Sequence, residues 1–82
     1  MTIAETIEKL EREQASTRFA ALVGICTAHF GEPRVKGSHH IFKTPWAGDP
    51  RLNLQADKSK AKPYQVGQVV DALKKLQQMK EK

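Results

Sequence analysis

The apolar side chains between residues 17 and 30 recur three or four positions apart, which is the spacing required by one face of a helix. Ser16 and Thr17 are residue types that favour a helix N-cap, and Gly31 is the residue type that most often follows a helix end. We therefore predict a core helix over residues 17–29. Its buried stripe consists of Phe19, Leu22, Val23, Cys26 and Phe30.

Residues 1–15 predict a shorter helix of a different character. Thr2 and Glu5 have the spacing of a capping box, in which each side chain accepts a hydrogen bond from the backbone N–H of the other residue. Ile3, Ile7 and Leu10 form only a narrow apolar stripe among charged residues. We therefore expect residues 1–15 to be an N-terminal extension that lies outside the core.

Between Gly31 and Gln55 the pattern changes to short runs of β-branched and aromatic residues, separated by turn-forming segments. These runs predict three strands near residues 32–36, 39–43 and 51–55. Their connections are too short for parallel crossovers, so we expect antiparallel hairpins. Leu52 and Leu54 alternate with polar residues, which predicts that one face of the sheet contacts the core and the other contacts solvent or a ligand.

A polar, lysine-rich loop over residues 56–63 leads into a second core helix. Gly67 costs about 1 kcal/mol relative to alanine inside a helix, so it lies in the first turn or permits a close approach. The element order predicts an α+β fold, a two-layer α-β-β-β-α sandwich whose three-stranded antiparallel sheet carries both helices on one face. We assign residues 16–82 to this domain. The apolar positions of the second helix are Val66, Val69, Val70, Leu73, Leu76 and Met79.

The positive charge is concentrated in the middle of the chain. The 82 residues carry a net charge of +5, and residues 34–62 hold seven Lys and Arg against two Asp and Glu. Such a stretch attracts a polyanion such as RNA, although a solvated lysine-rich loop has the same composition. At this length we expect a single domain.

Other features of the sequence limit the chemistry. Cys26 is the single cysteine, which excludes an internal disulfide, and its place on the apolar stripe predicts a buried, unreactive thiol. We find no glycine-rich phosphate loop and expect no cofactor. Acidic residues near the N-terminus do not suit a secretory signal, and no apolar run approaches the roughly 20 residues of a membrane span. We expect a cytoplasmic protein that does not enter a membrane.

The strongest candidate for chemistry is Lys36-Gly37-Ser38-His39-His40. Neighbouring residues on a strand point to opposite faces, so one histidine faces the open side of the sheet and the other is structural. Two such histidines do not readily bind one metal ion, so we expect no metal site. A histidine beside lysines suits metal-independent RNA cleavage, because imidazole can remove a proton from a 2′-hydroxyl. A surface or packing histidine is the alternative.

The segment from Gly37 to Pro45 resembles the signature of HicA-type toxins, and residues 52–55 and 60–66 resemble the later strand, loop and final helix of one HicA-like branch. The resemblance covers residues 17–78 in order. It implies a fold like that of a double-stranded RNA-binding domain, and an mRNA-cleaving toxin of a type II toxin–antitoxin system neutralised by a HicB-like antitoxin. It also implies that His39 is catalytic; His40 is the alternative, because some members have histidine only at that position.

Charge and location add further site residues. We predict that Lys36, Lys43, Lys60 and Lys62 contact phosphates, together with Gly37 and Ser38 of the motif. Trp46 either stacks on a base or anchors its loop, and Tyr64 is interpreted as a packing residue at a helix start. A non-catalytic RNA-binding module and a protein-interaction domain are the alternative functions. The oligomeric state is not predicted.

Overall fold

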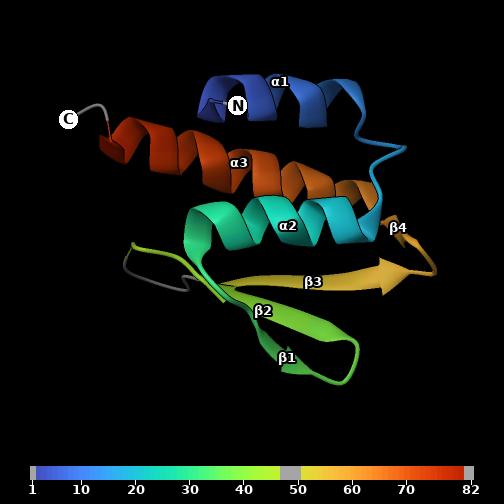
Figure 1. Cartoon of the computed structure of the whole chain (residues 1–82). Coiled ribbons are helices and arrows are strands. Elements are labelled where there is room, and N and C mark those ends of the chain that lie inside the picture. Colours follow the sequence, from blue (N-terminus) through green and yellow to red (C-terminus); the bar gives the residue numbers. More distant parts are fainter. Residues whose placement is uncertain (1, 47–50, 81–82) are drawn as a thin grey trace.

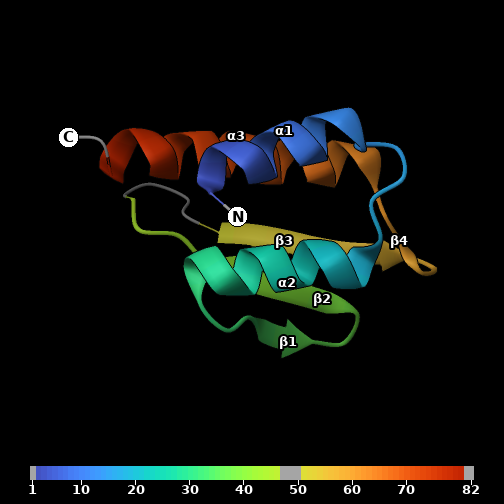
Figure 2. The same ribbon diagram turned by 45° about the horizontal axis from the view of Figure 1, so that its top comes forward.

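The chain forms three helices on one side of a four-stranded antiparallel sheet within residues 2–46 and 51–80, which the computed structural model describes (Figure 1). The predicted α+β class is confirmed. When the molecule is turned, α2 lies across β2 and β3, and α1 lies against α3 (Figure 2). The elements in chain order are α1 (Ile3–Arg12), α2 (Phe19–Phe30), β1 (Arg34–Lys36), β2 (His39–Lys43), β3 (Arg51–Asp57), β4 (Lys60–Ala61) and α3 (Pro63–Lys80).

A two-residue turn joins β1 to β2 and sets the register of the sheet. Lys36 pairs with His39 across this turn, so Gly37 and Ser38 are its two central residues. Gly37 has φ 60°, a conformation that is unfavourable for residues with a side chain. Glycine at the first central position is the requirement of a type II′ hairpin turn. The turn therefore fixes His39 as the first residue of β2.

The sheet contains a fourth strand that the sequence prediction missed. We expected a loop over residues 56–63, but β3 continues to Asp57 and the chain then turns back into β4. Ala56 pairs with Ala61, and Asp57 pairs with Lys60. A strand of two residues is too short to show an alternating pattern, and lysines surround it in the sequence. The prediction of a three-stranded sheet is therefore wrong by one strand.

The main core lies between α2, α3 and the face of β2 and β3 that carries Phe42, Leu52 and Leu54. Each large apolar side chain buried here contributes about 1.5–3 kcal/mol relative to an exposed one. The alternation predicted for β3 is confirmed, because Leu52 and Leu54 are buried while Arg51 and Asn53 are exposed. The side chains without solvent exposure in these elements are Leu22, Cys26, Phe42, Leu54, Val66, Val69 and Leu73.

The first helix is part of the core, contrary to the prediction for residues 1–15. Ile7 and Leu10 are buried in the same apolar cluster as α3. A salt bridge of 3.1 Å between Lys74 Nζ and Glu11 Oε2 lies at the solvent edge of the contact between α1 and α3. The apolar stripe on α1 is narrow because α1 packs mainly against a single helix, α3. The predicted capping box is confirmed, because Thr2 and Glu5 exchange both hydrogen bonds.

Gly67 lies in the second turn of α3, where it permits a close approach by Gln14. Gln14 Nε2 donates a hydrogen bond of 2.8 Å to the carbonyl oxygen of Pro63. A Cβ atom on residue 67 would lie 3.1 Å from the same Nε2 atom. The second of the two explanations for this glycine is therefore correct, and the partner is the segment that follows α1.

Candidate functional site

Within the described residues, one face of the sheet carries no helix, and the strand register determines which side chains lie on that face (Figure 1). His39 pairs with Lys36 on β1 and with Gln55 on β3, so these three side chains form a row across the sheet. Arg34, Ile41 and Asn53 form the next row, and Lys43 and Arg51 form the last one. The opposite face carries Phe42 and Leu54, so we call this side, bearing the three rows, the open face.

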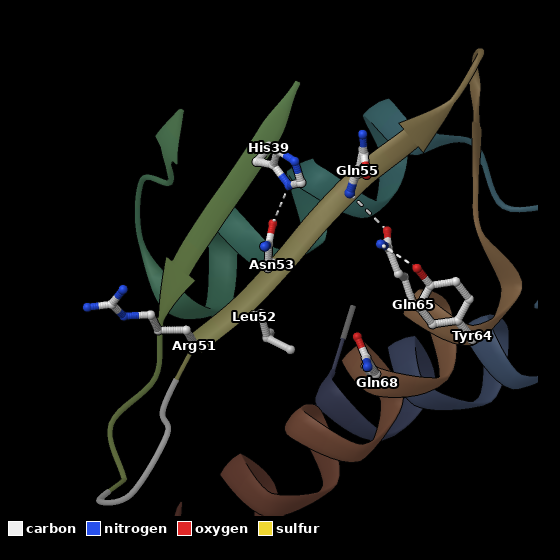
Figure 3. A pocket seen from close by; sticks show the side chains of 8 residues that line it. All are labelled: His39, Arg51, Leu52, Asn53, Gln55, Tyr64, Gln65 and Gln68. Carbon is white, nitrogen blue, oxygen red and sulfur yellow. Dashed lines mark hydrogen bonds between the residues drawn. The ribbon is translucent and has the colours of Figure 1, made fainter. Parts of the chain in front are cut away.

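His39 is held on the open face by a hydrogen bond. Its Nδ1 atom lies 3.0 Å from Oδ1 of Asn53, on the neighbouring strand (Figure 3). An amide oxygen only accepts hydrogen bonds, so Nδ1 carries the proton in this contact. In a neutral imidazole the other nitrogen, Nε2, then has a free lone pair. His39 is thus oriented with a basic nitrogen available for proton transfer.

His40 points the other way and packs against the helix layer. Its ring lies 5.1 Å from the ring of Phe19 on α2, in an edge-to-face arrangement of 74°. Its Nδ1 atom is buried and has no hydrogen-bond partner among the described residues. The structure thus places the two histidines on opposite faces, as their adjacent positions on a strand predict.

The turn before His39 is tied to β3. Gln55 Nε2 donates a hydrogen bond of 3.1 Å to Oγ of Ser38. The backbone N–H of Gln55 donates to Oε1 of Gln65 at 2.9 Å, so the start of α3 is attached to the same point on β3. Gln65 itself is only 5% exposed. The turn, His39 and the first turn of α3 therefore keep fixed positions relative to one another.

The predicted lysines do not form a single cluster. Lys36 lies directly across from His39, with their Cβ atoms roughly 5 Å apart for such a pair. Lys43 stands at the other end of β2, roughly 13 Å from His39 at about 3.3 Å per residue. Lys60 on β4 pairs with Asp57 at the end of β3, and the half-buried Lys62 precedes α3. Lys36 is thus the predicted lysine placed nearest to His39 by the register.

A cleft of about 480 Å³ opens between β3 and the start of α3, beside His39 (Figure 3). Sequence reasoning missed most of its residues because they come from two elements whose relative position no local pattern specifies. Tyr64 was interpreted as a packing residue, but its side chain is 60% exposed at this cleft, so that interpretation is wrong. The lining residues are His39, Arg51, Leu52, Asn53, Gln55, Tyr64, Gln65 and Gln68.

Trp46 packs against the helix layer, which agrees with the anchoring role, one of its two predicted roles. Its ring meets the ring of Phe30 edge to face at 6.1 Å, and Lys75 Nζ lies 4.8 Å from its centroid. It packs against the apolar core and is half-buried. The predicted turn residues 47–50 lie outside the described residues.

The thiol of Cys26 lies in the core and takes no part in the open face. Burial raises the pKa of Cys26 to about 12, which keeps the thiol protonated and weakly nucleophilic at neutral pH. Among the described residues, no group of three or more His, Cys, Asp or Glu side chains could hold a metal ion. In residues 2–46 and 51–80, no helix is long and apolar enough to cross a membrane.

We compared the chain with known protein families, curated proteins and solved structures. No family model, no curated protein and no solved structure matches the chain. The candidate site therefore stands on its own geometry: an oriented imidazole on an open, basic sheet face, next to a polar cleft.

Proposed function

We propose that the protein is an endoribonuclease toxin that cleaves mRNA without a metal ion, with His39 as the general base. The observation that carries this proposal is the hydrogen bond between His39 Nδ1 and Asn53 Oδ1, which leaves Nε2 free on the open face. The neutral form of an imidazole with its proton on Nδ1 can accept a proton at Nε2, which is the property that a general base requires. His40 does not suit the role, because it packs against Phe19.

The reaction requires few groups because RNA supplies its own nucleophile. Nε2 of His39 removes the proton of a 2′-hydroxyl, whose oxygen forms a bond to the adjacent phosphorus. The bond from phosphorus to the 5′ oxygen breaks, and this oxygen takes a proton from solvent. The products are a 2′,3′-cyclic phosphate and a 5′-hydroxyl end. A positioned general base of this kind contributes a rate factor of about 100 to 10,000.

The charges of the open face support an RNA substrate. Arg34 and Lys36 on β1 and Arg51 on β3 lie on the same face as His39. Cations near the reacting phosphate stabilise the negative charge that develops there. Lys36 is the first candidate for this role, because it pairs directly with His39. We assign Lys43, Lys60 and Lys62 to the path of the flanking phosphates.

The toxin assignment and the partner rest on the resemblance to HicA-type proteins. The order α2-β1-β2-β3 agrees with the start of the order that this resemblance implies, but the additional strand β4 lies between β3 and α3. In this proposal a HicB-like antitoxin neutralises the enzyme by covering the open face, where His39 is accessible.

Cleavage of labelled single-stranded RNA by purified protein in EDTA tests the enzyme. We expect the wild type to cut, and His39→Ala to lose about 100-fold or more in rate while its affinity for RNA stays within a factor of two. His40→Ala is the matched control, because it changes the adjacent residue on the opposite face. A folded wild-type protein that binds RNA with strong salt dependence but never cuts it would support the RNA-binding module instead.

The toxin role has a separate test in cells. Expression of the wild type should arrest growth, and expression of His39→Ala should not. Equal growth with both proteins at equal expression levels would refute the toxin assignment while leaving cleavage in vitro to be judged on its own.

A further inference from the structure

The cleft beside His39 differs in chemistry from the sheet face around it. Arg51 is the only fully charged side chain that lines it, and no acidic side chain does so among the described residues. Four amide side chains and one phenol supply most of its polar groups, and the buried Leu52 contributes apolar surface. A site for a phosphate would be rich in cations, so this lining suits a neutral and polar ligand. The four amides belong to Asn53, Gln55, Gln65 and Gln68.

We propose that this cleft binds one unpaired nucleobase of the RNA, next to the phosphate that is cut. The inference rests on the proposed function, because His39 defines where that phosphate lies. Amides present a donor and an acceptor side by side, which matches the hydrogen-bonding edge of a base. The volume of about 480 Å³ lies within the range of about 300–1,000 Å³ for small-ligand sites.

Tyr64 supplies the stacking surface. Its side chain is 60% exposed, which is unusual for a large aromatic residue that has a core beside it. Its hydroxyl accepts a hydrogen bond of 3.4 Å from Nε2 of Gln65, whose other end is fixed to β3 (Figure 3). The phenol is therefore positioned at the cleft without being buried. Stacking on an exposed aromatic ring is a sequence-tolerant source of affinity for single-stranded nucleic acid.

Gln68 supplies the hydrogen bonds that discriminate between bases. The amides of Asn53, Gln55 and Gln65 are engaged by His39, Ser38 and the backbone of Gln55, respectively. Gln68 is exposed, and its side chain makes no hydrogen bond within the described residues. It lies four residues after Tyr64 on α3, so both side chains stand on the same face of the helix. The base stacked on Tyr64 is thus within reach of the Gln68 amide.

This arrangement predicts the class of substrate. A base can enter the cleft only when it is unstacked and unpaired, as in loops and single strands of RNA. The cationic rows of the open face then hold the sugar–phosphate backbone on either side. We therefore infer that the enzyme prefers single-stranded RNA, with a base preference at the cut site that Gln68 sets.

Steady-state cleavage of single-stranded RNA tests the inference, with mapping of the cut sites. We expect Tyr64→Leu to raise KM about tenfold with little change in kcat, because it removes the ring and keeps apolar volume. Tyr64→Phe, the matched control, should stay within a factor of two. Gln68→Ala should broaden the choice of base at the cut site. Circular dichroism spectra and melting temperatures verify that each variant folds.

A second measurement does not depend on catalysis. Binding of a 2′-O-methyl oligoribonucleotide, which cannot be cut, should weaken about tenfold in Tyr64→Leu and should perturb the NMR signals of the Gln68 amide. Active enzyme whose KM, cut sites and oligonucleotide affinity are unchanged in Tyr64→Leu and Gln68→Ala would overturn the nucleobase site and leave the proposed function intact. Tyr64-dependent binding without any cleavage would support the site and refute the ribonuclease. If the oligonucleotide binds neither the wild type nor Tyr64→Leu, both the nucleobase site and the ribonuclease proposal would be refuted.

Discussion

His39 Nδ1 lies 3.0 Å from Asn53 Oδ1, although the two residues are not direct partners in the sheet. His39 pairs with Gln55, and Asn53 pairs with Ile41, so the contact runs diagonally between β2 and β3. Diagonal neighbours on adjacent strands lie about 7–8 Å apart, so they make contact only when their side chains extend toward each other. The contact thus depends on the full register of both strands.

We predict that Asn53 is a positioning residue for His39. Asn53→Ala should lower kcat about tenfold with KM nearly unchanged, because the imidazole loses its fixed tautomer and orientation. Asn53→Asp keeps the acceptor but adds a negative charge, which favours the protonated ring. The half-maximal rate should therefore occur at a higher pH than in the wild type. A pH–rate profile from pH 5 to 9 measures both effects, and an Asn53→Ala variant with wild-type kcat and profile would contradict the role.

The packing of α1 predicts a large cost for truncating Leu10. Its side chain is 2% exposed within the core. Leu10→Ala should lower the free energy of unfolding by about 2–4 kcal/mol, which is the usual cost of such a cavity. Urea titration monitored by circular dichroism measures the change. Glu8→Ala, on the exposed side of the same helix, serves as the control and should stay within about 0.5 kcal/mol. Equal stability of the two variants would mean that α1 does not share the core in solution.

The thiol of Cys26 predicts a loss of stability in alkaline solution. Burial raises its pKa from 9.0 to about 12, so the folded protein keeps a proton that the unfolded chain releases. The stabilisation is complete below pH 9 and should fall progressively as the pH rises from 9 toward 12, by up to about 1.4 kcal/mol per pH unit. Unfolding titrations at pH 8, 9 and 10 measure this slope. Cys26→Ala is less stable at every pH but should lack the part of the slope that belongs to the thiol.

We predict that substitutions of Gly67 and Gln14 have coupled effects on the free energy of unfolding. Gly67→Ala adds helix propensity of about 1 kcal/mol, but its Cβ would lie 3.1 Å from Nε2 of Gln14. In the wild-type background we expect the gain in unfolding free energy to be smaller by about 0.5 kcal/mol than in the Gln14→Ala background. A double-mutant cycle by urea denaturation gives the coupling. If the two substitutions have additive effects on the free energy of unfolding, the side chain of Gln14 moves away from the new methyl group at no energetic cost, which would contradict the prediction.

Local signals in the sequence predicted much of the fold. The capping box at Thr2 and Glu5, the glycine turn at Gly37 and the alternation around Leu52 each depend on contacts within a few residues. Features set by docking were missed. Leu10 is buried in the same cluster as α3, which lies against α1, and β4 is formed by pairing with the end of β3.

In the candidate site too, the residues of a local motif were predicted, and the residues that depend on packing between elements were missed. His39 belongs to a contiguous motif, and its alternation with His40 follows from strand geometry. Tyr64 and Gln68 reach the site through the position of α3 beside β3, where the core packing of α3 and the hydrogen bond between Gln65 and the backbone of Gln55 hold the helix. Such a contact joins residues from two elements, and one sequence carries no local pattern that reveals it.

The position of Trp46 gives the molecule a built-in optical probe. It is the single tryptophan of the chain, and it contacts Phe30 on α2 and Lys75 on α3 at once. Its fluorescence therefore reports whether both helices are docked at this end of the sheet, without any attached label. Arg51, Leu52 and Gln68 line both the cleft beside His39 and the adjoining hollow next to Trp46. The same emission can thus follow both folding and the arrival of a ligand in real time.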